Sequence, residues 1–420
     1  MIPTDLSSMS SRDTDRGSLA SRLAASLNGL VDVDMLLSKI LANARHVVNA
    51  EAGTVYLIQN GKLKFQTSQN EYLERLIHEA EDLPFLGSNL DIDSATLAGY
   101  AALNKTILTV NDTETIDFDA PFQHMISIDA STNYVCKAIM SIPLVTSNDM
   151  LLGVLQLINP LEGDGQICAF GQGDEAALAA YAQSVSLSLE RALMLKDSVI
   201  NCLKLVELHD QTETTAHVQR IALLTSIIYK NWAQKHQVPA SEKDRILNIL
   251  PLAAMLHDVG KAWIPTHILN KPGRLSKEER EIMEDHVSLG AKLYAEAVTP
   301  MDSLVYDIIC DHHERWDGLG YPGVKNLGDG GTERPETGGP NGRRGKKGEE
   351  ISIYGRILAV ADVFDALSSR KTYKEPFDES LAVQIMLQES GRHFDPSVIE
   401  SFLAVRPVLA KIRKRFPEDI

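Results

Sequence analysis

Two hydrophobic spacings divide the chain into a mixed N-terminal part and a helical C-terminal part. Residues 31–48 carry apolar side chains three and four positions apart, which predicts an amphipathic helix. Two β-rich runs, 53–58 and 62–65, flank Asn60-Gly61, a pair typical of a tight hairpin turn. Further short apolar runs at 106–110, 138–145 and 151–158 indicate that these strands belong to a mixed or antiparallel sheet.

A segment without proline or glycine follows the predicted sheet. From Asp174 to Leu208 the chain is rich in Ala, Leu, Ser and Glu, which favours one long helix. This helix is apolar on several sides and joins two parts of the chain, so two arrangements are open: pairing with its copy in a dimer, or packing against its own domains.

After about residue 206 the pattern is helical except in one segment. Residues 326–350 are dense in Gly, Pro, Arg, Lys and Glu, which predicts a mobile surface loop inserted into the helical part. Its basic residues Arg343, Arg344, Lys346 and Lys347 are expected to face solvent or to attract phosphate groups.

Composition narrows the classes of partner. The chain has 420 residues, of which 44% are hydrophobic and 23% charged, as in a folded protein of two or three domains. A net charge of −16 opposes binding to nucleic acid polymers or anionic membranes. The four cysteines are scattered, and residues 1–27 form a polar tail that lacks the apolar core of a secretory signal, so we expect a cytoplasmic protein.

Histidines and aspartates with ligand chemistry are concentrated in the helical part. His257 and Asp258 end an apolar helical run, and Glu213 and His217 are spaced to share one helix face. The other candidates are His286, His312, His313 and Asp362. Such a mixture of imidazoles and carboxylates suits iron, manganese or zinc better than magnesium or calcium, which prefer oxygen ligands alone.

The N-terminal part resembles a GAF domain over roughly residues 28–190, through the segments 52–57, 141–144 and 153–159. Asn159, Phe170 and Asp174-Glu175 are similar to the signature of GAF domains related to those of cyclic nucleotide phosphodiesterases. In that signature a lysine follows the asparagine and pairs with the aspartate, but Pro160 stands there in this chain. The resemblance therefore implies a domain used for dimerisation or for an unknown small ligand.

The helical part resembles the HD-GYP subgroup of the HD phosphohydrolases. The segments that carry the likeness are 256–261, 264–265, 268–275 and 312–322, and the segments 361–367 and 391–396 extend it over residues 206–405. The resemblance implies an all-helical domain with a site of two or three metal ions. It also implies hydrolysis of cyclic di-GMP, or, as in some members, of cyclic GMP-AMP.

Matched position by position, the resemblance implies a role for each candidate. His217, His257, Asp258 and Asp362 would bind one ion and His286, His312 and His313 a second, with Asp258 as the bridge; Glu213 would accompany a third ion, which favours three ions over two. Lys261 and Asp258 are the expected catalytic residues, with Lys261 at the scissile phosphate. The residues expected at the substrate are Asp365, Lys371, Lys374, Gly320, Tyr321 and Pro322; Lys371 stands where arginine is commoner.

The expected fold is multi-domain. A polar tail (1–27) precedes an α+β GAF sensor domain (28–173), a linker helix (174–208) and an all-α HD-GYP domain (209–420). We expect the chain to hydrolyse cyclic di-GMP to linear pGpG and onward to GMP, with iron as the metal and manganese as the alternative. A homodimer would form through the GAF domain and the linker helix. Two alternatives remain open, a cyclic GMP-AMP phosphodiesterase and a cyclic di-GMP binding module with little turnover, and hydrolysis by the purified protein separates the enzyme from the binding module.

Overall fold

The computed structural model describes residues 11–70, 89–117, 119–122, 134–210, 214–323, 345–369 and 377–417. It divides into two compact units, Met1–Leu195 and Lys196–Ile420. No helix in the described ranges is long and apolar enough to cross a membrane.

The first unit is built on an antiparallel sheet of order β3-β2-β1-β6-β5-β4. Its strands are β1 (Ala50–Gln59), β2 (Lys62–Asn70), β3 (Asn89–Leu90), β4 (Leu108–Val110), β5 (Ile139–Val145) and β6 (Leu151–Pro160). The hairpin predicted at Asn60-Gly61 is confirmed, since these residues join β1 to β2 with φ values of 53° and 74°. Such positive φ angles match the twist that the two strands require.

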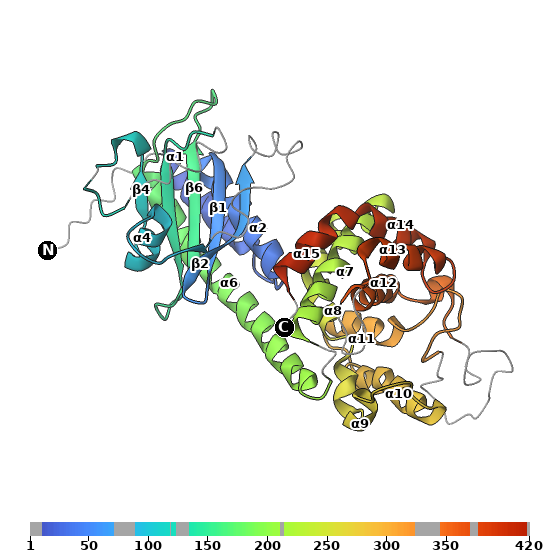
Figure 1. Cartoon of the computed structure of the whole chain (residues 1–420). Helices are drawn as coiled ribbons and strands as arrows, with labels where there is room; N and C mark the ends of the chain where they lie inside the picture. Colours follow the sequence, from blue (N-terminus) through green and yellow to red (C-terminus); the bar gives the residue numbers. More distant parts are fainter. Residues whose placement is uncertain are drawn as a thin grey trace. The chain divides into compact units, whose positions relative to one another are not determined.

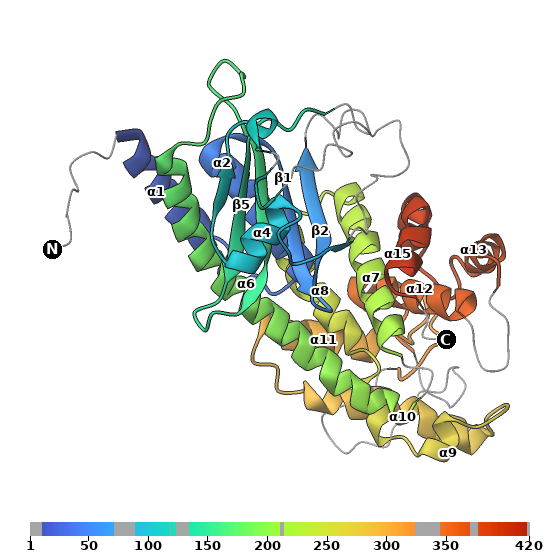
Figure 2. The same ribbon diagram turned by 60° about the vertical axis from the view of Figure 1, so that its left-hand side comes forward.

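Side chains of β1 alternate between the two faces of this sheet, as its two-residue period requires. Val55 and Leu57 belong to the main core with α2 (Val33–Val48), whereas Tyr56 and Ile58 pack in a smaller cluster with α4 (Leu97–Asn104). Figures 1 and 2 show α2 and α4 on opposite faces of the sheet. A short helix η1 (Thr113–Thr115) follows β4.

The predicted polar tail is in part a helix, α1 (Ser11–Ala25). Its small apolar face enters the main core, where Ala20, Ala24 and Leu27 are buried. Among the described side chains of the helix, only Ala20 and Ala24 are fully buried, with Leu19 and Leu23 partly buried, and this pattern was too weak for the sequence to predict the helix. On its polar side Arg16 forms an ion pair with Asp174. In the GAF signature a lysine pairs with this aspartate. Pro160 stands at the lysine position here, and Arg16 provides a cation beside Asp174.

The predicted linker helix is α6 (Gln172–Glu207). Leu178, Val185 and Leu189 on its first half are buried in the core of the first unit. A separate row of large apolar side chains remains exposed, with exposed fractions of 47% for Leu187, 62% for Met194, 64% for Leu205 and 81% for Leu208.

Every named secondary-structure element in the described residues of the second unit is a helix, which confirms the predicted fold class. Its longer helices are α7 (Thr215–Lys235), α8 (Ala240–Met255), α10 (Lys277–Leu293), α11 (Pro300–Asp311) and α12 (Ile353–Ser368). Shorter elements are η2 (Val259–Trp263), α9 (Thr266–Leu269), η3 (Gly348–Glu350), α13 (Glu379–Gln388), α14 (Pro396–Ala404), η4 (Arg406–Val408) and α15 (Leu409–Arg415). Helix α7 packs against α8 and α12, and α11 packs against the same two helices. The four helices form the frame around the candidate site.

The end of the predicted mobile loop is ordered. Lys346 Nζ lies 2.5 Å from the buried carboxylate of Asp311, and the Lys346 amide donates to Glu314. Residues 345–350 therefore belong to the folded unit, because leaving Asp311 without a cation in the interior would be costly. Residues 326–344 of the predicted loop lie outside the described ranges.

Candidate metal centre

Separate helices bring the predicted ligands to one place. Their sources are α7 (His217), the residues after α8 (His257 and Asp258), α10 (His286), the end of α11 (His312 and His313) and α12 (Asp362). His217 lies in the first turn of α7, whose N-cap Thr214 accepts a hydrogen bond from the His217 amide. His257 and Asp258 come directly after α8 ends, so their side chains are held by the helix frame without being part of a helix.

The ligand atoms form two groups. Asp258, His286, His312 and His313 each offer one atom within 4.8 Å of the others, and the same limit holds for His217, His257 and Asp362. Both groups combine carboxylate and imidazole donors, which is the chemistry of transition-metal sites. The structure thus brings together the seven assigned metal ligands that lie in the described ranges.

Asp258 lies between the two groups. Its Oδ2 is 3.2 Å from His257 Nε2, whereas its Oδ1 is 3.1 Å from His286 Nε2 and 3.4 Å from His312 Nε2. One oxygen thus faces each group, which is the arrangement a bridging carboxylate needs.

Buried atoms that make no hydrogen bond test whether metal ions fit here. Within the described residues, His286 Nε2, His312 Nε2 and Asp258 Oδ1 are buried without a hydrogen-bond partner. Buried polar atoms left in this way cost free energy unless something else satisfies them. All three residues belong to the group whose ligand atoms lie within 4.8 Å of one another, so a cation among them would satisfy them together. The residues present fit a divalent metal ion.

The other ring nitrogen of these histidines fixes the tautomer. Nδ1 of His257, His286 and His312 lies 2.9, 2.7 and 2.9 Å from the carbonyl oxygens of Ala254, Met283 and Ile309. Because a carbonyl only accepts, Nδ1 carries the proton and donates it. Nε2 then presents its lone pair to the site, as metal-binding histidines do.

Burial and charge keep the ligands in their metal-binding protonation states. Burial lowers the pKa of His312, and burial together with the neighbouring His312 and His286 lowers the pKa of His313 well below its usual range. Burial raises the pKa of Asp258, but the adjacent Lys261 ammonium group opposes this effect, and the pKa lies well below its usual range. Near neutral pH His312 and His313 are therefore neutral and Asp258 carries its negative charge.

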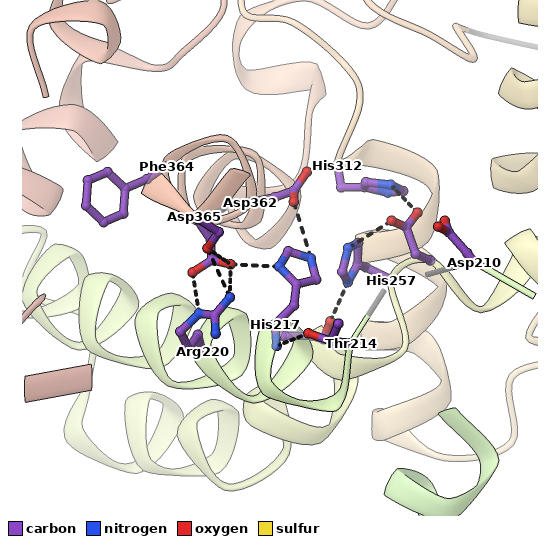
Figure 3. A network of polar contacts seen from close by, with 12 residues as sticks. Asp210, Thr214, His217, Arg220, His257, His312, Asp362, Phe364 and Asp365 are labelled. Carbon is purple, nitrogen blue, oxygen red and sulfur yellow. Dashed lines mark hydrogen bonds and ion pairs between the residues drawn. The ribbon is translucent and has the colours of Figure 1, made fainter. Parts of the chain in front are cut away.

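Asp365 differs from its predicted place at the nucleotide. Its carboxylate is buried and accepts from Arg220 Nε at 2.7 Å and Arg220 Nη2 at 2.8 Å, while Oδ2 lies 2.8 Å from His217 Nδ1 (Figure 3). Both oxygens are thus occupied inside the protein. Asp365 orients the His217 ring, whose Nε2 is 3.7 Å from Asp362 Oδ1. Its i, i+3 spacing from Asp362 suited either role, and only the position of Arg220 decides between them.

Lys261 lies at the edge of the ligand groups. Its Nζ is 2.8 Å from Asp258 Oδ2 and 3.5 Å from Asp210 Oδ2. The Lys261 side chain keeps 15% of its surface exposed, whereas that of Asp210 keeps 3%. The predicted catalytic pair, Lys261 and Asp258, is therefore in direct contact. Sequence reasoning missed Asp210, since one carboxylate just after a predicted helix carries no signal of its own.

The segment with Gly320, Tyr321 and Pro322 packs against the ligands. The Tyr321 ring stacks on the His313 ring with centroids 4.6 Å apart, and the Tyr321 amide donates to the His313 carbonyl. A Cβ at Gly320 would lie 2.4 Å from the Arg315 amide nitrogen, so only glycine allows this approach. The structure places the segment beside the site, where Tyr321 supports a candidate ligand.

Three predicted residues fall outside the described ranges: Glu213, Lys371 and Lys374. The third metal ion and the two phosphate-facing lysines therefore remain predictions.

Gly260 shows how closely η2 packs on α10. A Cβ there would lie 1.9 Å from the His286 carbonyl oxygen and 2.8 Å from the Gly290 nitrogen, and backbone cannot yield as a flexible side chain does. We expect Gly260→Ala to lower the free energy of unfolding of this unit by about 1–3 kcal/mol and to lower hydrolysis, because Lys261 and His286 flank the clash. Urea unfolding checks this. Gly163→Ala, where a Cβ meets nothing within 4 Å, is the control that should change neither property.

Fold and site together define a two-domain protein, with an α/β sheet domain followed by a helical domain that carries a His/Asp metal centre. Family models match both parts: GAF domain over residues 32–189 and HD domain over residues 195–367. The chain therefore contains a GAF domain followed by an HD domain.

Relatives of this chain are named as phosphodiesterases of cyclic dinucleotides. The 3'3'-cGAMP-specific phosphodiesterase 2 of Vibrio cholerae is 34% identical over 58% of this chain and 42% of the relative. A cyclic di-GMP phosphodiesterase of Vibrio cholerae is 33% identical, covering 53% and 42% of the two chains, and one of Thermotoga maritima is 34% identical, covering 53% and 52%. The chain thus spans about half the length of the curated relatives it matches.

Proposed function

We propose that this chain is a metal-dependent phosphodiesterase that opens cyclic di-GMP to linear pGpG and converts it onward to GMP. The observation that carries the proposal is the pair of ligand groups joined by Asp258, with Lys261 Nζ 2.8 Å from the bridging carboxylate. Closely spaced cations suit phosphodiesters, whose negative charge repels nucleophiles. The names of the relatives support cyclic dinucleotides as the substrate class.

In this proposal His217, His257, Asp258 and Asp362 hold one ion, and His286, His312 and His313 hold another. Iron is the metal we favour, with manganese as the alternative, because imidazole and carboxylate donors suit both. Bound at this site, such ions lower the pKa of water and neutralise phosphoryl charge. A third ion at Glu213 is part of the same proposal.

The protein's own contribution centres on Lys261. Its ammonium group lies beside Asp258 at the edge of the site and contacts a non-bridging oxygen of the scissile phosphate. A water oxygen adds to phosphorus, the bond from phosphorus to the 3′ oxygen breaks, and the leaving oxygen takes up a proton. Lys261 assists that oxygen by hydrogen bonding, while Lys371 and Lys374 hold the other phosphate.

A product assay tests the proposal. Full-length protein purified without oxygen and assayed for metal content is given cyclic di-GMP, and the nucleotides are separated by chromatography. We expect pGpG to appear first and GMP later. Metal-loaded protein that binds cyclic di-GMP without releasing pGpG would instead be a binding module.

A second substrate is favoured by one specific observation. A relative that matches 58% of this chain is named for 3'3'-cGAMP, not for cyclic di-GMP. The same assay with both dinucleotides in competition decides between them: a higher kcat/KM for cyclic di-GMP supports the first proposal, and a higher value for 3'3'-cGAMP replaces it.

We also propose that α6 pairs with its copy and that the GAF domain, through an unknown small ligand, regulates hydrolysis. Leu187 and Met194 lie seven positions apart on α6, and Leu208, directly after its end, lies fourteen further on. With Leu205 between them, this spacing is that of the contact positions of paired helices. The four free cysteines suit the reducing cytoplasm, where we place the protein.

Charges placed on this row should separate the copies. We expect Met194→Glu with Leu205→Glu to halve the molar mass measured by light scattering, because charge repulsion and desolvation oppose pairing. Leu293→Glu, which changes a residue 52% exposed on α10, should leave the mass unchanged. A native protein that already has the mass of one chain would rule out the dimer.

A further inference from the structure

The end of the linker helix reaches the metal centre through a residue that the expected site does not include. Asp210 follows α6, and its amide donates to the Val206 carbonyl at 2.8 Å, which continues the helical turn. Its carboxylate is 3.5 Å from Lys261 Nζ, and its side chain is only 3% exposed. The Lys261 ammonium group therefore lies between two carboxylates, Asp258 in the ligand groups and Asp210 from the linker helix.

We infer that Asp210 is a positioning residue for Lys261 and makes the end of α6 part of the catalytic apparatus. The inference rests on the proposed function, in which Lys261 contacts the phosphodiester. Lysine carries its charge on a flexible four-carbon stem. With Asp258 alone, the ammonium group would be drawn onto a carboxylate that the metal ions also need. A second carboxylate on another element holds the group in one place, and fixed geometry is a large part of catalysis.

Two further contacts tie the end of α6 to the same unit. The His209 carbonyl accepts from Asn270 Nδ2 at 2.8 Å, and Glu207 accepts from Thr215 Oγ1 at 2.8 Å. Thr215 is the first residue of α7, the helix that carries His217. A shift or rotation of α6 would therefore move the Asp210 carboxylate and, with it, the Lys261 ammonium group. Because α6 begins in the GAF domain, this contact gives the sensor a direct route to the catalytic lysine.

A double-mutant cycle tests the inference on the full chain. Asp210→Asn, Lys261→Met and the double variant are assayed with cyclic di-GMP and with the generic diester bis(p-nitrophenyl) phosphate. We expect Asp210→Asn to lower kcat by about 10- to 100-fold with KM and metal content unchanged. In the Lys261→Met background the same change should alter kcat less than twofold, and Asp210→Glu should restore part of the loss. Asp197→Asn, an exposed change on α6, is the matched control.

Additive effects in the cycle would show that Asp210 does not act through Lys261 and would overturn the inference. Loss of bound metal in Asp210→Asn would overturn it as well, since Asp210 would then be a ligand. Hydrogen exchange gives a readout that needs no turnover: amides of residues 259–263 should exchange faster in Asp210→Asn than in Asp197→Asn, and equal rates would contradict the inference. If native protein cleaves bis(p-nitrophenyl) phosphate but neither cyclic dinucleotide, the proposed substrate fails while the cycle still tests Asp210.

Discussion

Replacing Asp258 by Asn should lower kcat/KM for cyclic di-GMP at least about a thousandfold, equivalent to about 4 kcal/mol of transition-state stabilisation. The amide keeps the size of the side chain but loses the negative charge. It also offers one oxygen where the two ligand groups require two, since Oδ1 faces His286 and His312 while Oδ2 faces His257. The ions would then lose their common ligand.

Metal analysis beside the kinetic assay identifies the cause. We expect the Asp258→Asn protein to retain its fold and to carry less metal than the native protein after the same purification. Asp378→Asn is the matched control: Asp378 is the N-cap of α13, and asparagine caps a helix equally well. Near-native turnover by metal-loaded Asp258→Asn would contradict both the bridging role and the proposed chemistry.

Replacing Arg220 by Met should produce the largest loss of stability that we predict. Arg220 and Asp365 form a buried pair with side-chain exposures of 5% and 6%. Removing one partner of such a pair leaves an uncompensated charge in the interior, at a cost of about 3–5 kcal/mol. Arg406→Met removes a pair whose arginine side chain is 43% exposed and should cost about 0–1 kcal/mol. Urea unfolding of both variants measures the difference.

The same pair predicts a dependence on pH. Burial raises the pKa of Asp365, but Arg220 and His217 outweigh it and hold this pKa well below its usual range. A carboxyl with a lowered folded-state pKa stabilises the protein above its unfolded value of about 3.9 and loses that contribution as pH falls further. Arg220→Met should therefore flatten the loss of stability below about pH 4. Urea unfolding measured from pH 6 downward checks this. If the free energy of unfolding fell with pH as steeply in the variant as in the native protein, the pair would not be the cause of the loss.

The elements of the fold with strong local patterns could be predicted from the sequence. Asn60-Gly61 specifies a hairpin by its own backbone preferences, and the proline-free run after Asp174 specifies a helix. Helix α1 could not be predicted, because its fully buried residues are the small Ala20 and Ala24, which give a weak apolar signal. Its burial depends on α2 and α6, which the local sequence does not show.

The candidate ligands were found because resemblance fixes residues one at a time, whatever their separation along the chain. The residues around them were harder to predict. Asp365 was expected to face the nucleotide, yet its partner Arg220 lies 145 positions away in sequence. Asp210 likewise meets Lys261 only once α6 and η2 are folded. Supporting contacts of this kind come from tertiary packing, which spacing along one element does not reveal.

Helix α1 determines where the GAF domain can be separated from the rest of the sequence. A fragment that began at residue 28 would keep every strand of the sheet. It would expose the apolar surface against which Ala20, Ala24 and Leu27 pack. It would also leave the buried carboxylate of Asp174 without Arg16. Such a fragment would tend to aggregate, and failure to bind a ligand would then say nothing about the intact GAF domain. Ligand screens should therefore use a GAF fragment that retains α1.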